Sequence, residues 1–553
     1  MLDAFTTRLR ALLPPSSDWD AVKRSPRRDL LAGLTVAVVA LPLALAFGAT
    51  SGLGAEAGIA TAVVAGAVAA IFGGSNLQVS GPTGAMTVVL VPVVHQFGAT
   101  GVLFVGFLAG LALLALSAAG VGRYVRFLPA PVVEGFTAGI AVVIALQQVP
   151  SALGVEASDQ ERVWAVAFEA VKEFLADPAL APPLVAIAVC ALMLVGARWR
   201  TVFPFSLVGV ILATVVSVAF GMDLAPIGDL PAGLPAPSLG FLDAGAVTTL
   251  LPAVVAVTAL AALESLLSAT VADGMSVGEQ HDPDRELFGQ GLANLAAPVF
   301  GGIPATAAIA RTAVNVRAGA GSKLAAFTHA AVLLVIVLVA APLVSEIPLA
   351  ALAGVLLATT IRMVEVSSLK AMARATRGDA TVLILTFAIT VVFDLVAAVV
   401  VGLGVAIVIA LRSVAKSASL EEVPLDHADH SREERELFGQ HIVAYRLDGP
   451  LFFAAAHQFL LELTEVADVR VVILRMARVS TMDVTGAQVL GDAIDRLEKR
   501  GIVVLVSGIN PGHDEVLAAI GAAEHLKANG RVFADTPSAI AFARKVALAA
   551  PAY

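Results

Sequence analysis

The sequence has little charge and almost no cysteine. Only 14% of its 553 residues are Asp, Glu, Lys or Arg, whereas about one-quarter of a water-soluble domain is charged. This shortage excludes a soluble enzyme, a nucleic-acid-binding protein and a disordered scaffold. The formal net charge of −9 is mild and implies no polyanionic partner. The single cysteine, Cys190, cannot form an intrachain disulfide or a thiolate metal cluster, so redox chemistry and cofactors are not expected.

Hydrophobic residues are abundant instead, at 58% of the chain with a mean hydropathy of +0.88. This composition indicates a polytopic helical membrane protein. Residues 421–553 nevertheless hold 32 of the 79 charged residues, which predicts a soluble domain after the membrane part. The expected organisation is a cytoplasmic N-terminal segment (1–28), a transmembrane domain (29–418), a linker (419–439) and a soluble α/β domain (440–553).

The apolar runs predict about fourteen membrane spans, because a spanning helix needs about 20 mostly apolar residues. Those near 80–97, 286–300 and 305–318 are too short to cross the bilayer alone. The expected spans are 30–48, 56–73, 80–97, 101–120, 130–150, 181–198, 203–221, 247–271, 286–300, 305–318, 324–345, 347–362, 380–394 and 396–413.

Basic residues set the expected orientation of these spans. Arg24, Arg27 and Arg28 precede the first span, and further Lys and Arg clusters follow even-numbered spans. The loop 222–246 has three aspartates and no basic residue. By the positive-inside rule, the N-terminus and the C-terminal domain are expected in the cytoplasm, with the protein in the inner (plasma) membrane.

A weak internal repeat relates the two halves of the membrane part. Gly73-Gly74 and Gly301-Gly302 each end a span, and each precedes a segment rich in Gly, Pro, Ser and Thr that opens a short helix. Seven spans separate the two segments, so the second half is expected to be inverted. Interrupted helices at equivalent positions indicate a transporter site near the midplane. The alternative is that Gly and Pro are simply common in membrane helices.

Two half-helices starting at Thr83 and Thr306 would direct free backbone N–H groups at one point. Each helix N-terminus carries about half a positive charge, and such N-termini bind anions. Small neighbouring residues would let a small ligand reach the backbone. These residues are Gly81, Gly84, Ala85, Ala307 and Ala308.

Two ionisable residues lie within apolar segments, Glu264 and Arg311. A charge in hydrocarbon costs at least ~2.5–3.5 kcal/mol, so it indicates a functional site. Glu264 is a candidate coupling group for a proton or Na⁺, with Ser268 one turn away on the same face. The alternative is a structural pair with Arg311 that only joins two helices.

The C-terminal region alternates strand-like and helix-like segments, which predicts an α/β domain of about 100 residues. Strands are expected at 443–447, 471–474 and 502–506, and helices near 455–466, 484–500 and 511–520. Asp483 is a candidate N-cap of the helix that begins at Val484. The domain has no phosphate-binding glycine motif, so nucleotide hydrolysis is not expected.

The chain resembles the sulfate permease family, solute carrier family 26 in animals. The residues that carry the resemblance are Leu41-Pro42-Leu43-Ala44-Leu45-Ala46-Phe47, Val79-Ser80-Gly81-Pro82-Thr83-Gly84, Pro131-Val132-Val133-Glu134-Gly135-Phe136-Thr137-Ala138-Gly139 and Arg311-Thr312-Ala313-Val314-Asn315. The tail resembles a STAS domain through Asp483-Val484-Thr485-Gly486. The resemblance implies seven-plus-seven inverted repeats with core and gate domains, and usually a homodimer.

The resemblance also implies the site. The family binds sulfate, bicarbonate, chloride or dicarboxylates between the half-helices of spans three and ten. The expected substrate-binding residues are Phe47, Thr83, Gly84, Ala85, Ala307, Ala308, Ala310 and Arg311. Glu264 and Ser268 are the expected coupling residues, and Asp483 and Thr485 are expected to be regulatory.

The expected function is secondary active transport of a small anion, with proton symport favoured because a carboxylate among leucines is costly to keep ionised. No metal is expected apart from Na⁺ as an alternative ligand of Glu264. Alternatives are Na⁺-coupled bicarbonate transport, anion exchange, an anion channel, or a membrane-anchored sensor. A cytosolic protein is an expected partner of the tail, and the lipid bilayer is the other partner.

Overall fold

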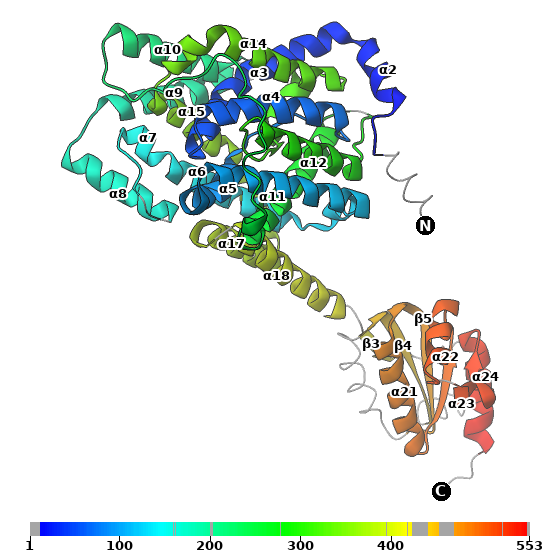
Figure 1. Ribbon diagram of the computed structural model, residues 1–553. Helices are drawn as coiled ribbons and strands as arrows, with labels where there is room; N and C mark the ends of the chain where they lie inside the picture. Colours follow the sequence, from blue (N-terminus) through cyan, green and yellow to red (C-terminus); the bar gives the residue numbers. More distant parts are fainter. Residues whose placement is uncertain are drawn as a thin grey trace. The chain divides into compact units, whose positions relative to one another are not determined.

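The structure is a computed structural model that divides into two compact units, Met1–Leu403 and Gly404–Tyr553. It describes residues 12–158, 160, 162–199, 203–276, 278–393, 395–416, 419–422, 441–452, 469–522 and 524–549. The first unit is a helical bundle and the second is an α/β domain (Figure 1).

The helices reproduce the expected spans. Every one of the fourteen expected ranges overlaps a described helix, and nine helices in the described part of the chain are long and apolar enough to cross a membrane. The helices are α2 (Ser16–Arg24), α3 (Pro26–Thr50), α4 (Ala55–Phe72), α5 (Gly84–Ala119), α6 (Ala130–Gln147), α7 (Val149–Leu153), α8 (Val163–Ala176), α9 (Ala181–Trp199), α10 (Phe205–Ala219), α11 (Val247–Met275), α12 (Pro283–Val299), α13 (Ile309–Arg317), α14 (Lys323–Ser345), α15 (Leu349–Met363), α16 (Val366–Ala375), α17 (Arg377–Val392) and α18 (Leu395–Lys416).

The third and fourth expected spans form one interrupted helix. Helix α5 is 36 residues long and breaks at Gly98, whose φ of 67° is not helical. Glycine adopts this left-handed conformation without steric penalty. The break divides α5 into a short half-helix that begins at Gly84 and a longer helix that continues to Ala119.

Small residues allow the helices of the bundle to approach closely. A Cβ atom added to Gly58 of α4 would lie 2.0 Å from the Ala44 carbonyl oxygen and 2.8 Å from Gly48 Cα, both in α3. Close backbone approach at small residues is how membrane helices associate. The first of these helices, α3, also packs against α14, so the two halves of the chain are interleaved.

The helices of the first unit form two groups. Helices α3, α4, α5, α11, α12, α13 and α14 pack mainly with one another, and α6, α9, α10, α15 and α17 form the second group. Contacts between the groups involve α3 with α10 and α15, and α5 with α6. Each group draws helices from both halves of the sequence.

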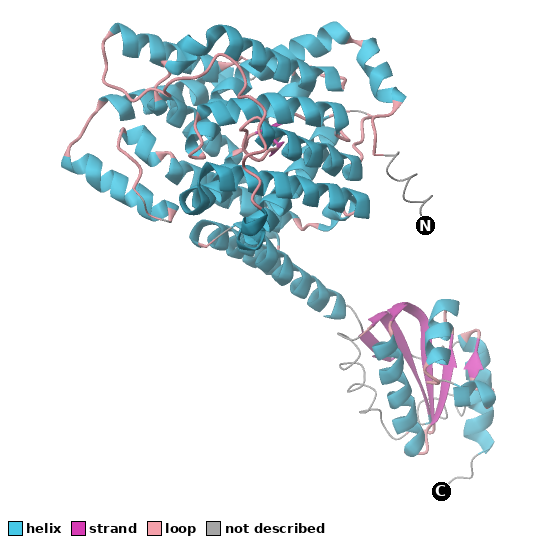
Figure 2. Cartoon of the chain, in the orientation of Figure 1, coloured by secondary structure: helices cyan, strands magenta, loops and turns pink. Residues whose placement is uncertain are grey.

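A pair of very short strands joins the two halves inside the first group. Strand β1 (Ser80–Gly81) pairs antiparallel with β2 (Thr306–Ala307), and Figure 2 shows this strand segment within the helical unit. The second half-helix therefore does not start at Thr306 as the sequence suggests. Because Thr306 and Ala307 are extended and paired with β1, α13 begins at Ile309, with Ala308 as its N-cap.

The second unit contains a five-stranded sheet with the order β3-β4-β5-β6-β7. The last four strands are parallel, and β3 is antiparallel to β4. Helix α24 covers one face, whereas α21 and α22 cover the other. The elements are β3 (Ser419–Glu422), β4 (Ile442–Leu451), β5 (Val471–Met482), α21 (Val484–Lys499), β6 (Val503–Ser507), α22 (Pro511–Ala519), α23 (Glu524–Ala528), β7 (Val532–Phe533) and α24 (Thr536–Ala549).

Two expectations for this unit need comment. The first four residues of the expected linker, 419–422, form β3, and an ion pair between Glu421 and Arg446 of β4 joins it to the sheet. The expected helix near 455–466 lies outside the described residues. The three expected strands and the helices at 484–500 and 511–520 are confirmed.

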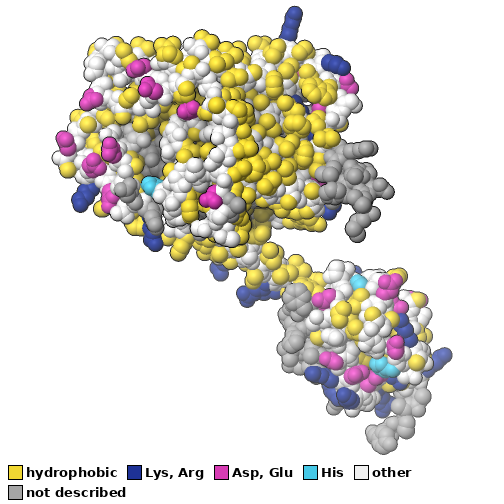
Figure 3. Space-filling view, viewed as in Figure 1, with side chains coloured by type: hydrophobic (Ala, Val, Ile, Leu, Met, Phe, Trp, Pro, Cys, Tyr) yellow, Lys and Arg dark blue, Asp and Glu magenta, His cyan; other side chains and the backbone are white. Residues whose placement is uncertain are grey.

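The surface of the first unit suits a bilayer. Figure 3 shows a broad area of hydrophobic side chains over the helical unit, and most charged side chains on this face lie towards its edges. Large apolar side chains such as Leu184, Ile187 and Val339 are exposed on apolar helices. Exposed apolar surface on this scale identifies a membrane contact.

Candidate functional site

The N-terminus of α5 forms the first part of the site. Thr83 is the N-cap, with extended backbone, and its Oγ1 accepts a hydrogen bond from the Met86 N–H at 3.5 Å. The first N–H groups of a helix have no partner within the helix, so Gly84 and Ala85 offer donors here. Phe47 of α3 lies against this end, because a Cβ atom on Gly84 would be 3.0 Å from Phe47 Cε1.

Glu264 of α11 reaches this helix end. The Thr83 hydroxyl donates a hydrogen bond to Glu264 Oε2 at 3.0 Å, although 181 residues separate the two in sequence. The Glu264 side chain is half-buried rather than sealed in the bundle. The carboxylate therefore lies beside a positively polarised helix end.

Arg311 of α13 contacts the segment Gly81–Pro82, which directly precedes Thr83. Arg311 is 1% exposed, and its Nη2 donates a hydrogen bond to the Pro82 carbonyl oxygen at 2.6 Å. Nη1 is buried without a hydrogen-bond partner among the described protein atoms, close to Gly81. The charges of Arg311 and Glu264 interact electrostatically, while the hydrogen bonds of the two side chains go to Pro82 and Thr83 respectively. The alternative of a structural pair between them stays open.

A buried polar network that the sequence does not predict holds β2 in place. Ser265 Oγ lies 2.8 Å from Thr306 Oγ1 and accepts from the Ala307 N–H at 3.2 Å. The Asn294 side-chain amide exchanges two hydrogen bonds of 2.8 Å with the backbone of Ala305. A detectable signal existed in the sequence, since Gln290 and Asn294 lie one turn apart in the part of α12 after Glu286, which is otherwise apolar.

The remaining predicted site residues, three alanines and Ser268, lie in β2, α13 and α11. Ala307 lies in β2 and Ala308 caps α13, whereas Ala310 is exposed in the first turn of α13. Ser268 is fully buried, and its hydroxyl donates to Thr312 Oγ1 at 3.0 Å. Ser268 therefore supports α13 in this structure and makes no hydrogen bond with Glu264.

A cavity of about 270 Å³ lies between the two groups of helices, and none of the predicted substrate-binding or coupling residues is among its lining residues. Ala46 and Thr50, on either side of Phe47 in α3, line one wall, and His95 of α5 lines another. The second group contributes the amide side chain of Gln147, whose nitrogen and oxygen have no partner among the described protein atoms. The lining is mainly apolar with a few polar side chains, and the space can hold water between the groups.

The predicted regulatory residues lie at the start of α21. Asp483 Oδ1 accepts a hydrogen bond from the Gly486 N–H at 2.7 Å, as expected of an N-cap. Thr485 is exposed. A Cβ atom on Gly486 would lie 2.1 Å from the Leu451 carbonyl oxygen, so this turn requires glycine.

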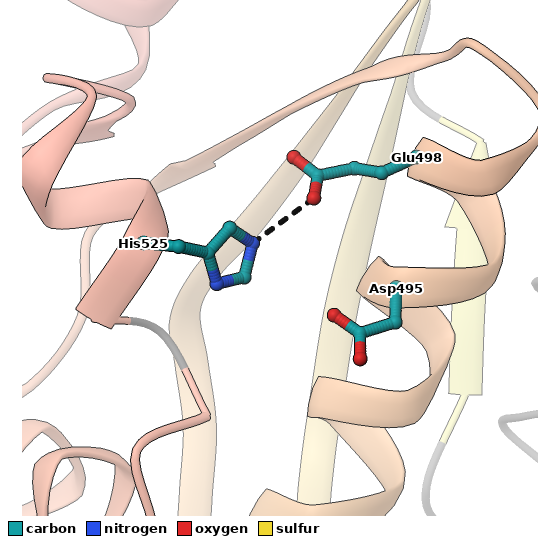
Figure 4. A group of neighbouring side chains, drawn as sticks. All are labelled: Asp495, Glu498 and His525. Atoms are coloured by element: carbon teal, nitrogen blue, oxygen red, sulfur yellow. Dashed lines mark hydrogen bonds and ion pairs between the residues drawn. The ribbon is translucent and has the colours of Figure 1, made fainter.

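One group of side chains in the second unit has the composition of a metal site. Asp495, Glu498 and His525 place their ligand atoms within 4.8 Å of one another (Figure 4). The Glu498 carboxylate is already engaged, since His525 Nε2 lies 3.0 Å from Oε2 and Arg531 Nη1 donates to Oε1 at 2.8 Å. Glu498, His525 and Arg531 therefore form a network that joins α21, α23 and the segment before β7.

Known proteins with related sequences identify the class. Residues 27–386 match the sulfate permease family, and residues 438–539 match the STAS domain. The putative sulfate transporter YvdB of Bacillus subtilis is 36% identical over 503 residues, covering 90% of this chain and 94% of that protein. The bicarbonate transporter BicA of Synechocystis is 31% identical over 502 residues, covering 88% of each.

A solved structure shares the fold. The murine solute carrier 26 family member A9 anion transporter, in the inward-facing state, matches with a TM-score of 0.82 at 17% identity, covering 97% of this chain and 94% of that chain. These similarities define a multi-pass membrane transporter, not an enzyme. The chain belongs to the sulfate permease family, which confirms the resemblance noted in the sequence.

Proposed function

We propose that this protein is a secondary active transporter of a small oxyanion, sulfate, bicarbonate or a dicarboxylate, driven by proton symport. The observation that carries the proposal is the hydrogen bond between Thr83 and Glu264. It places a titratable carboxylate in contact with the N-terminus of a half-helix, where an anion would bind. Relatives named for sulfate and for bicarbonate support the substrate class.

The proposed anion site lies between the starts of α5 and α13. The N–H groups of Gly84 and Ala85 would bind the anion, with Phe47 as an apolar wall and Ala307, Ala308 and Ala310 leaving room near α13. The buried charge of Arg311 would add a positive potential without a direct bond. Alternating access would then move the first group of helices against the second.

The Thr83 hydroxyl would couple the two ligands. An ionised carboxylate only accepts hydrogen bonds, so ionised Glu264 takes the single hydrogen of the Thr83 hydroxyl. Protonated Glu264 can donate to Thr83 Oγ1 instead, which frees the threonine hydrogen to donate to the anion. Proton binding would therefore favour anion binding, and by linkage the anion would favour the proton.

Na⁺-coupled bicarbonate transport is the second candidate. The similarity to BicA supports it, and the Glu264 carboxylate can bind a cation. Anion exchange and a channel on the same fold remain further alternatives. The same proposal places the protein in the inner (plasma) membrane, with both termini in the cytoplasm and domain boundaries near residues 28, 418 and 440. It also includes a homodimer and a cytosolic protein partner of the STAS domain.

Uptake into proteoliposomes tests the proposal. The pH gradient and the Na⁺ gradient are imposed separately, and labelled sulfate, bicarbonate and succinate are compared. We expect one of these anions to accumulate when the outside is acidic, without Na⁺. Accumulation that requires Na⁺ at equal pH would favour the second candidate, and large unitary currents would favour a channel.

Thr83→Val is expected to weaken the pH dependence of anion affinity and to reduce affinity about ten- to hundred-fold. Valine keeps the shape of threonine but removes the hydroxyl, whose bond to a charged group is worth about 1.5–3 kcal/mol. Thr87→Val is the matched control, because Thr87 donates only to the Gly84 carbonyl oxygen of the same helix. Thr83→Ser should restore coupling. Equal effects of Thr83→Val and Thr87→Val would contradict the coupling role.

Deleting residues 425–553 is expected to leave anion affinity intact. Every described contact of the site lies in the first unit, and the second unit has its own apolar clusters. We expect lower expression, altered dimerisation or an altered rate, measured on the purified truncated protein. If binding is abolished in folded truncated protein, the STAS domain would be part of the site.

A further inference from the structure

Helix α8 carries an unpartnered apolar stripe. Trp164, Phe168, Val171 and Leu175 are 48%, 70%, 42% and 72% exposed. Their spacing of four, three and four residues places them on one side of the helix, within an arc of about 60° at about 100° per residue. Single exposed apolar residues are ordinary, whereas four in one line require a partner.

The other sides of α8 are different. Ala167 and Ala170 are buried, and the helix packs against α6 and α7 at the margin of the bundle (Figure 1). Lys172 lies beside the stripe, whereas Glu169 and Glu173 lie further round the helix, on the side away from the stripe. The helix therefore presents one side to protein, one to water and one, the stripe, to an apolar surrounding.

We propose that α8 lies in the membrane interface, with the Trp164–Leu175 stripe inserted at the boundary between lipid headgroups and acyl chains. The helix has 14 residues, about 21 Å in length, which is too short to cross an acyl core of about 30 Å. An apolar stripe beside a charged side is the pattern of helices that lie in the plane of the bilayer surface.

The adjoining helix shows that lipid is the partner. The exposed apolar residues continue through Leu180 to Leu184 and Ile187 of α9. Helix α9 is a candidate membrane span, so its exposed apolar side faces lipid. The stripe is continuous along the chain with this lipid-facing surface. Because α8 follows the fifth expected span (130–150), it would lie on the side of the membrane opposite to the N-terminus.

The charges of α8 define the kind of lipid contact. Two acidic residues and one lysine line its polar side, so an anionic headgroup has no basic cluster to bind. The attraction would be hydrophobic, with Trp164 at the depth where tryptophan is enriched. The guanidinium of Arg162 lies over the Trp164 ring at 5.9 Å, on the headgroup side.

Insertion of α8 would also fix one wall of the cavity between the two groups of helices. Val163 and Val166, on the protein side of the helix, line the cavity of about 270 Å³ between the two groups of helices. Lipid contact on one side of α8 would thus hold the cavity wall at a constant depth in the bilayer. This inference concerns lipid contact and stands whichever anion or coupling ion is transported.

Tryptophan quenching by brominated lipids tests the proposal on the full chain. The chain has three tryptophans, so Trp19→Phe with Trp199→Phe leaves Trp164 as the only one. In vesicles of zwitterionic lipid brominated near the headgroup end of the acyl chains, we expect about twofold lower emission. Lipid brominated near the chain ends should quench less, and adding anionic lipid should change nothing.

A second variant provides the matched control. It replaces all three tryptophans by phenylalanine and carries Glu173→Trp, so that the probe lies on the polar side of the same helix. This probe should be quenched by aqueous iodide and little by brominated lipid. If Trp164 is quenched only by iodide, the stripe faces water; if neither reagent quenches it, a protein surface such as a second copy covers the stripe. Either result overturns the proposal.

Discussion

Glu264→Gln is expected to bind and exchange anion but to lose all accumulation driven by a pH gradient. Glutamine keeps the size of the side chain and cannot gain or lose a proton. Its amide can donate to Thr83 Oγ1, as protonated Glu264 would at the contact of 3.0 Å. The variant should therefore resemble the protonated, anion-binding form at every pH.

The expected effect is large because coupling is all or none. One pH unit is worth about 1.4 kcal/mol per proton, so electroneutral symport with a monovalent anion supports about tenfold accumulation per unit. The variant should reach the same internal and external concentrations while retaining counterflow. Labelled-anion uptake with pH and Na⁺ varied independently measures both quantities.

Glu134→Gln provides the matched control. Glu134 of α6 is also half-buried and also accepts a hydrogen bond from a hydroxyl, that of Ser368 at 3.0 Å. It belongs to the second group of helices, away from the site, so accumulation should persist. If Glu264→Gln still concentrates anion against its gradient under a pH difference, Glu264 is not the coupling residue.

Much of the membrane fold could be predicted from the sequence, because the hydrocarbon core of a bilayer restricts which backbone structures can cross it. Apolar runs must become helices that satisfy their own backbone, and the expected ranges overlap the observed helices. The repeat marked by Gly73-Gly74 and Gly301-Gly302 also located the pairing of the two halves. The residues after each glycine pair form β1 and β2, which meet antiparallel.

The details of the site depend on long-range partners that local pattern does not show. Ser268 shares a helix face with Glu264, yet its hydroxyl turns to Thr312, 44 residues later. Thr306 suits a helix start, but pairing with β1 keeps it extended. In both cases, a partner from a distant segment decides the outcome: the hydrogen bond of the Ser268 hydroxyl in the first case, and the backbone conformation of Thr306 in the second.

The N-terminal segment illustrates the same limit. Asp18 of α2 forms ion pairs with Arg285 at the start of α12 and with Lys323 at the start of α14. All three side chains are buried. A cluster with partners more than 260 residues apart has no signature in the sequence, where Asp18 is one charge in a mixed segment.

Arg311→Ala is expected to weaken anion binding ten- to hundred-fold. The change removes the buried positive charge nearest the site and the donor to the Pro82 carbonyl oxygen, a charge-assisted bond worth about 1.5–3 kcal/mol. Pro82 directly precedes Thr83, so the start of α5 also loses its support. Affinity measured by counterflow, together with thermal stability, separates a loss of binding from a loss of folding.

Two further variants separate the charge of Arg311 from its hydrogen bond. Arg311→Lys keeps the charge but lacks the fork of donors that arginine presents, so it should recover part of the affinity. Arg317→Ala removes an exposed arginine at the end of the same helix and should leave affinity unchanged. Unchanged affinity in folded Arg311→Ala would mean that neither the charge of Arg311 nor its bond to Pro82 contributes to binding, and that the N-termini of α5 and α13 suffice to bind the anion.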